Sequence, residues 1–109
     1  MISKNEKEKI PITITDTLNR VIHERARLGI MTKLMAEGEL DFTALKKSLS
    51  LSDGNLNAHL KVLLKNEYVL MTKEFVANKP RTAYRVTDKG EQAFNEYINS
   101  LEKFLESIS

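Results

Sequence analysis

The sequence predicts a mainly α-helical domain that carries one small β-hairpin. Apolar residues recur at helical spacing through most of the chain, most clearly at Leu56, Leu60, Leu63 and Leu64. The period changes only between residues 68 and 87, where two short runs of strand-forming residues flank a loop. A chain of 109 residues is long enough for one modest hydrophobic core.

Composition sets the class of protein. Charged residues make up 29% of the chain and hydrophobic residues 41%, as in ordinary globular proteins. The absence of cysteine excludes disulfides and thiolate metal sites. The first ten residues lack the apolar stretch of a secretory signal, and no apolar run approaches the roughly 18 residues that span a bilayer. We therefore expect a soluble, cytoplasmic protein with no membrane partner.

Charge is distributed unevenly along the chain. From residue 88 onwards there are two basic and five acidic residues, net −3, which leaves +5 for residues 1–87 out of an overall +2. A basic body with an acidic C-terminal segment suits a protein whose body faces a polyanion. An uneven but merely solvated surface would show the same charges.

Four helices are expected before the hairpin. They span residues 15–23, 24–40, 41–50 and 51–67. Asp16, Asp41 and Ser52 are suitable N-caps, and Gly38 is a suitable stop. Residues 1–11 are polar apart from a few positions and are expected to be flexible, which leaves residues 12–109 as a single domain.

The hairpin is expected from strands at residues 68–76 and 82–87. Asn78 and Pro80 predict a loop over residues 77–82, because proline cannot donate to a strand ladder. A last helix is expected over residues 88–107, where one long apolar stripe follows the helical period. Such a helix is roughly 30 Å long.

The order of these elements is more specific than any one of them. The third and fourth helices are joined tightly and form a helix-turn-helix over about residues 41–66. The hairpin follows over about residues 68–87, with four basic residues against Glu74 alone. A helix-turn-helix followed by a hairpin with a basic tip is a winged helix.

The chain resembles the ArsR/MarR-type winged-helix transcriptional regulators, in particular the small single-domain branch of bacteria and archaea. The resemblance lies in "IHERARLGIMTKL", "GELDFTALKKSLSLSDGNLNAHLKVLLKNEYV" and "KPRTAYRVTDKGEQAF" and covers roughly residues 18–105. It implies that the fourth helix contacts DNA bases, that the hairpin is the wing, and that terminal helices pair two subunits. The metal sensing of many ArsR-type proteins uses thiolates and does not carry over to a chain without cysteine.

The exposed side of the fourth helix is the predicted DNA-binding surface. Its residues are Gly54, Asn55, Asn57, Ala58, His59, Lys61 and Lys65. Small residues let the helix backbone approach a groove, asparagine pairs bidentately with adenine, and lysine contacts phosphates. The alternative is that the two asparagines are ordinary surface residues.

The two histidines have several interpretations. His59 would contact DNA, pack at the edge of the core, or titrate near neutral pH. His23 looks like a helix-end residue. Two histidines 36 positions apart without cysteine do not make a metal site, so no metal or other cofactor is expected.

The wing contributes Lys79, Arg81 and Thr82 to the predicted DNA-binding residues. Arginine in a wing enters a narrow minor groove, where the negative potential is enhanced. Arg81 is therefore the single residue expected to contribute most to affinity. A solvated loop, charged for solubility, is the alternative.

The last helix is predicted to form a homodimer interface. The residues of its stripe are Phe94, Tyr97, Ile98, Leu101, Phe104 and Leu105. The same stripe would also close the core of its own chain, but so long a helix overruns that core. A symmetric dimer would bind a pseudo-palindromic operator with half-sites about 10 bp apart.

These observations favour a dimeric, sequence-specific double-stranded DNA-binding transcriptional regulator, most simply a repressor. The resemblance leaves room for an unidentified small effector between the first helix and the dimer helices. A winged-helix module for protein–protein contacts is the alternative function. An enzyme is not expected, because the chain has no nucleophile motif, glycine-rich phosphate loop or obvious acid pair.

Overall fold

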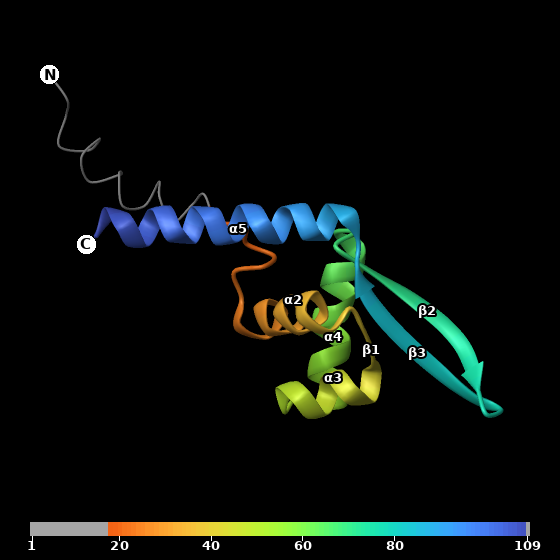
Figure 1. Ribbon diagram of the computed structural model, residues 1–109. Coiled ribbons are helices and arrows are strands. Elements are labelled where there is room, and N and C mark those ends of the chain that lie inside the picture. Colours follow the sequence, from red (N-terminus) through yellow and green to blue (C-terminus); the bar gives the residue numbers. More distant parts are fainter. Residues whose placement is uncertain (1–17, 109) are drawn as a thin grey trace, which may run out of the picture.

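The computed structural model describes residues 18–108 (Figure 1). Four helices and one three-stranded sheet occur in this part of the chain. In chain order they are α2 (Arg25–Glu37), β1 (Glu39–Asp41), α3 (Phe42–Leu49), α4 (Asp53–Lys65), β2 (Val69–Val76), β3 (Lys79–Val86) and α5 (Asp88–Ser107). This is the predicted mainly helical winged helix, and the fold class is confirmed.

Local capping explains where three of the helices begin. The side chains of Asp41 and Ser52 accept hydrogen bonds from the amides two residues into α3 and α4, at 2.8 Å from Ala44 N and 3.1 Å from Asn55 N. Both caps were predicted from sequence. The cap of α2 is Glu24, which accepts from Arg27 N at 2.8 Å.

Residues 18–24 are not helical, so the prediction of a helix at 15–23 is wrong over its described part. The side chain of Asn19 accepts hydrogen bonds from the amides of Val21 and Ile22 at 2.9 and 3.1 Å. Such a local side-chain bond offers the backbone an alternative to the helix. Residues 15–17, and the flexible segment predicted for residues 1–11, lie outside the described residues.

The sheet is antiparallel with the strand order β1-β3-β2. The strand β1 was not predicted, because three residues between the stop of α2 and the cap of α3 are too few to show a period. The predicted loop at residues 77–82 is also wrong. Only Ala77 and Asn78 turn the chain, both with positive φ (54° and 64°), and β3 already begins at Lys79.

Pro80 therefore lies in a strand, opposite Phe75 of β2. The third strand β1 pairs only with residues 83–85 of β3. At Pro80 the edge of β3 that faces away from β2 therefore has no neighbouring strand. A backbone N–H is not needed at this edge, so proline is tolerated.

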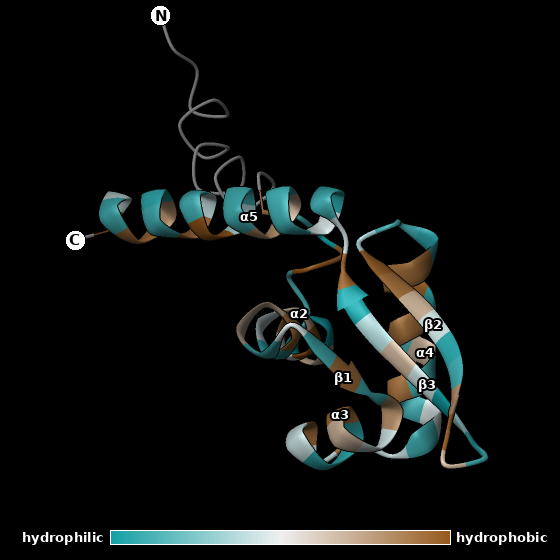
Figure 2. Ribbon diagram, turned by 45° about the vertical axis from the view of Figure 1, so that its right-hand side comes forward, coloured by the Kyte–Doolittle hydropathy of each residue, from teal (hydrophilic) through white to brown (hydrophobic). Residues whose placement is uncertain are grey.

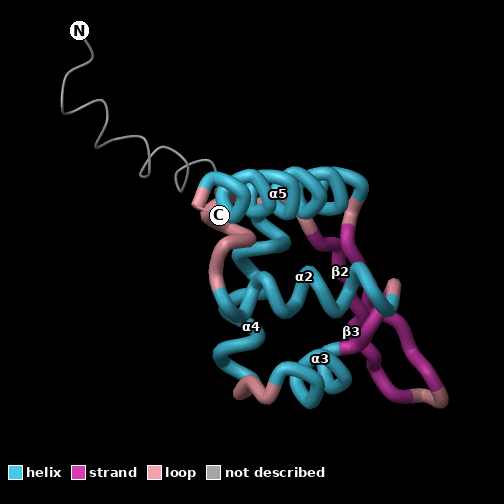
Figure 3. The backbone as a smooth tube through the Cα atoms, turned by 60° about the vertical axis from the view of Figure 1, so that its left-hand side comes forward, coloured by secondary structure: helices cyan, strands magenta, loops and turns pink. Residues whose placement is uncertain are grey.

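Two apolar clusters hold the elements together. The larger joins α2, α3 and α4 to the base of the hairpin through residues such as Ile30, Leu45 and Leu60. The smaller lies between α5 and the segment before α2 and contains Leu18, Ile22 and Tyr97. Figures 1 and 3 show the result: α5, α2 and α3 lie at successive levels, with α4 beside them and the hairpin projecting beyond them.

Candidate nucleic-acid interface

One side of α4 is anchored in the core and the other is open. Leu56, Leu60 and Leu63 are each at most 1% exposed. Six of the seven predicted DNA-binding residues of this helix are exposed, namely Gly54, Asn55, Asn57, Ala58, Lys61 and Lys65. The structure thus brings these six onto one surface, and their contact with DNA stays a prediction.

The acidic residue at the start of α4 is matched by a cation of α3. Lys46 Nζ lies 2.7 Å from Asp53 Oδ1. This ion pair bridges the two helices of the helix-turn-helix and offsets the negative charge of Asp53. The pair is exposed and adds little to stability, but it lowers the repulsion that Asp53 would exert on a phosphate.

His59 differs from the other six residues because it turns towards α2. Its Nδ1 lies 3.1 Å from Arg27 Nη1 and 3.5 Å from Glu24 Oε1. The contact with Arg27 is a hydrogen bond when Nδ1 carries no proton, and the contact with Glu24 is an ion pair when the imidazole is protonated. Half-buried, His59 ties α4 to the start of α2, as in the interpretation that placed it at the edge of the core.

Glu24 is the centre of this contact. Burial acts to raise the pKa of the Glu24 carboxyl, but the backbone N–H groups of Arg27 and Ala26, followed by the charges of His59 and Arg27, lower the pKa below its ordinary value. Glu24 is therefore an anion that caps α2 and faces α4 at the same time.

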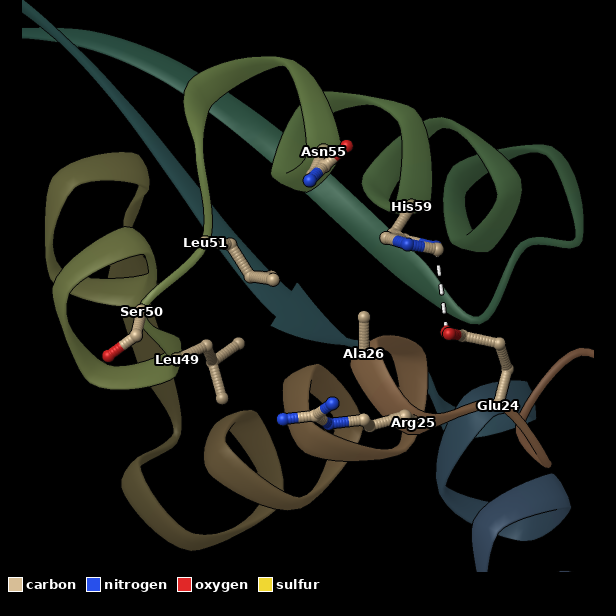
Figure 4. A pocket seen from close by; sticks show the side chains of 8 residues that line it. All are labelled: Glu24, Arg25, Ala26, Leu49, Ser50, Leu51, Asn55 and His59. Atoms are coloured by element: carbon tan, nitrogen blue, oxygen red, sulfur yellow. Dashed lines mark ion pairs between the residues drawn. The ribbon is translucent and has the colours of Figure 1, made fainter.

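A polar cleft of about 560 Å³ lies beside this contact (Figure 4). It is bounded by the start of α2, the connection between α3 and α4, and the flank of α4 that carries Asn55 and His59. Figure 4 shows Arg25 and Ser50 on the side of the cleft opposite α4. No sequence pattern indicates this cleft, because its residues come from three separate segments and share no motif.

The two faces of the wing have different chemistry. Residues opposite each other in an antiparallel pair lie on the same face, so the register divides the hairpin. The inner face continues from the buried Val69 and Tyr84 to the tip and carries Met71, Lys73, Phe75, Pro80 and Thr82. The outer face of the tip carries Glu74, Val76, Lys79 and Arg81.

Arg81 is surrounded by carboxylates on the outer face. Its guanidinium lies 2.5 Å from Glu74, 3.5 Å from Asp41 and 3.7 Å from Glu39. The hydrogen bond to Glu74 raises the pKa of Arg81, and the charges of all three carboxylates act in the same direction. Arg81 thus links β3 to both neighbouring strands, a role that the sequence did not indicate because β1 was not predicted.

The stripe of α5 is used in two ways. Tyr97 is 2% exposed, and its hydroxyl lies 2.7 Å from His23 Nδ1, so this residue closes the core of its own chain. Phe94, Ile98 and Leu101 pack against the same cluster. Further along, Leu105 is 51% exposed and Ile108 69%. Figure 2 shows the brown, apolar side of α5 continuing past the other described helices.

Comparison with known proteins identifies the class. The model of a family of winged helix DNA-binding domains matches residues 26–105, and the chain belongs to that family. It is a family of DNA-binding domains and not of enzymes, and the resemblance drawn from the sequence is confirmed.

Two proteins are similar to the chain in sequence, and a third is similar in fold. It is 30% identical to the uncharacterized protein MJ0432 of Methanocaldococcus jannaschii over 82% of this chain and 97% of the relative. A transcriptional regulator homologue from Pyrococcus horikoshii OT3 has 30% identity and a TM-score of 0.80, over 90% of this chain and 95% of the other. The PcaV transcriptional regulator from Streptomyces coelicolor, solved with its natural ligand, shares the fold at 12% identity with a TM-score of 0.68, over 96% and 73%.

Residues 18–108 contain neither a membrane-spanning helix nor a cluster of metal ligands. None of the described helices is both long and apolar enough to cross a membrane. Within the same residues, no group of three or more histidine, aspartate or glutamate side chains is arranged to hold a metal ion.

Proposed function

We propose that this DNA-binding regulator acts as a homodimer that occupies a pseudo-palindromic operator and represses transcription. The observation that carries the proposal is the exposed side of α4, where small, amide and basic side chains face solvent although the fold uses none of them. In a winged helix this side enters the major groove.

Each residue of α4 has a separate role in the proposal. Gly54 and Ala58 keep the helix thin where it faces the groove. Asn55 and Asn57 contact base edges from the two flanks, and adenine is the base that asparagine pairs with bidentately. Lys61 and Lys65 neutralise phosphates and fix the register. His59 supports this surface from the side by its contacts with α2.

The wing contacts the neighbouring minor groove. Lys79 and Thr82 are close to the tip and supply a cation and a hydroxyl for phosphates. Arg81 adds positive charge, but its three carboxylate partners make it foremost a residue that positions the wing. Its removal would leave Glu39, Asp41 and Glu74 without a counter-charge close to the DNA.

The C-terminal half of α5 pairs two subunits. Leu101 packs at the edge of the described core, Phe104 is half-buried, and the exposed fraction then rises to 51% at Leu105 and 69% at Ile108. Burial of this surface in a second copy would remove it from water. Two subunits then present two copies of α4, which fit half-sites about 10 bp apart.

We extend the proposal to a small effector that shifts the dimer between geometries with high and low DNA affinity. PcaV, which has the same fold, was solved with a natural ligand. The action of such a regulator takes place where the chromosome lies, in the cytoplasm of a prokaryotic cell.

Fluorescence anisotropy with labelled duplexes tests the proposal. One duplex carries the region upstream of the protein's own gene and a second carries the same bases scrambled. We expect tight binding to the first, with log Kd rising steeply with log salt, and weaker binding by Arg81→Ala. Absence of salt-dependent binding to any duplex would contradict the proposal and favour the alternative, a module for protein–protein contacts.

A further inference from the structure

The tip of the wing carries an apolar pair that the fold does not use. Phe75 is 77% exposed, more than any other large apolar side chain of residues 18–108. Pro80 lies directly opposite Phe75 on the same face, and it is exposed as well. Val69 and Tyr84 are buried at the base of this face and belong to the core. The apolar side chains of Phe75 and Pro80 extend this face beyond the core to the exposed tip.

The two faces of the wing also differ in charge. All residues of the hairpin are described, and on its inner face, from Tyr84 to the tip, Lys73 is the one charged residue. On the outer face three carboxylates gather around Arg81. The basic Lys79 and Arg85 of the outer face balance its remaining carboxylates, whereas Lys73 gives the inner face a net positive charge. A polyanion is therefore attracted more to the inner face, where its phosphates meet Lys73 beside the apolar pair.

We propose that Phe75 and Pro80 pack against the deoxyribose rings that line the minor groove, while Lys73 contacts a flanking phosphate. This inference rests on the proposed function, in which α4 occupies the adjacent major groove. The sugar rings of DNA offer C–H surface to an apolar side chain, and apolar side chains are known at minor-groove contacts. The wing then adds affinity by an apolar contact that is largely independent of sequence.

A protein partner fits this surface less well. Even with Met71, which is 42% exposed on the same face, Phe75 and Pro80 form an apolar patch far below the roughly 1,000 Å² that a stable interface between proteins buries. The cation beside the patch also favours a polyanion over a second copy of the same wing.

Salt-dependent binding separates the apolar contact from an ionic one. The probe is a duplex of about 30 bp of random sequence at low salt, because contacts to sugars do not need the operator. Phe75→Ala is expected to weaken binding about tenfold per wing without changing the slope of log Kd against log salt. Lys73→Ala is expected to reduce that slope by about 0.9 per wing. Val76→Ala is the matched control, since Val76 is 52% exposed on the outer face of the same tip.

A spectroscopic measurement gives an independent answer. The chain has no tryptophan, so Phe75→Trp introduces a single indole. We expect its emission to shift to the blue and to be protected from acrylamide when the duplex is added. The control Val76→Trp, on the outer face, is expected to stay accessible to acrylamide.

The outcomes distinguish this inference from the function on which it rests. If the unmodified protein binds no duplex at any salt concentration, both are overturned. If it binds with a salt-dependent Kd while Phe75→Ala and Val76→Ala bind equally well, only the apolar wing contact is overturned. A decrease in oligomeric mass on Phe75→Ala, with DNA binding unchanged, would assign the tip to contacts between copies instead.

Discussion

The helices α4 and α5 begin in the same way, but their exposed surfaces differ in chemical character. Each is capped by a hydroxyl, from Ser52 in α4 and from Thr87 in α5, and each has a glycine in its first turn. The exposed side of α4 is small and basic, whereas one side of the end of α5 exposes the apolar residues Leu105 and Ile108. The fold accounts for neither surface, so each points to a partner of its own kind: a polyanion for α4 and an apolar face for α5.

The glycines of the two first turns, Gly54 and Gly90, have different surroundings. A Cβ at position 90 would collide with the carbonyl oxygen of Tyr68, while a Cβ at position 54 would meet nothing within 4 Å. Glycine at position 90 is therefore required for α5 to pack on the connection between α4 and β2. Glycine at position 54 is not required by the described part of the chain.

Gly90→Ala is expected to have the largest effect on stability. The added methyl group collides with main-chain atoms that belong to the hydrogen-bonded junction between Tyr68 and Thr87. We expect the free energy of unfolding to fall by about 3 kcal/mol, measured by urea denaturation. A variant as stable as the unmodified protein would show that α5 does not pack this closely.

Leu105→Glu tests the apolar end of α5. A charge at the centre of the proposed dimer contact is expected to raise the dissociation constant of the dimer by about thirtyfold, or about 2 kcal/mol, measured by sedimentation at several concentrations. Asn99→Glu places the same charge on the opposite side of the helix and serves as the control. Equal dimerisation of both variants would remove this surface from the proposed interface.

Gly54→Ala tests the surface of α4. Since no atom of the described chain occupies the space, we expect stability within about 0.5 kcal/mol of the unmodified protein. The methyl group would nevertheless hold α4 away from the groove, so the affinity for the upstream duplex is expected to fall about tenfold. Unchanged affinity would mean that α4 does not approach DNA at this end.

The smallest effect is expected at Glu24, which links α2 to α4. Its pKa is lowered in the folded protein from the ordinary 4.5, so its stabilising charge is fully present above pH 4.5 and is lost as the pH falls through the lower folded value. Glu24→Gln is expected to cost about 0.5 kcal/mol at pH 7, because it removes a negative charge from the N-terminus of α2.

The pH dependence of this difference is the measurement. Urea denaturation at pH 7 and at pH 3 should show the difference between Glu24→Gln and the unmodified protein shrinking in acid. Glu37→Gln, at the C-terminal end of the same helix, is the control, since a negative charge there does not favour the helix dipole. A difference at Glu24 that stays constant with pH would contradict the role of its charge.

Local sequence signals determined most of the architecture. The stripe of Leu56, Leu60 and Leu63 fixed which side of α4 is buried, and Asp41 and Ser52 fixed where α3 and α4 begin, because helical periodicity and caps act within a few residues. The six exposed residues of α4 follow directly from that stripe. The boundaries of α5 followed in the same way from its apolar pattern.

Tertiary contacts decided what the sequence could not show. The strand β1 exists because β3 pairs with it, and that pairing gives Arg81 the partners Glu39 and Asp41. Pro80 is tolerated in β3 because β1 ends before it, and His59 meets Glu24 because α2 packs beside α4. These contacts join side chains that are distant in sequence, so no local period or spacing predicts them. The leucine stripes and the caps depend only on residues close together in the sequence, so the sequence predicts them.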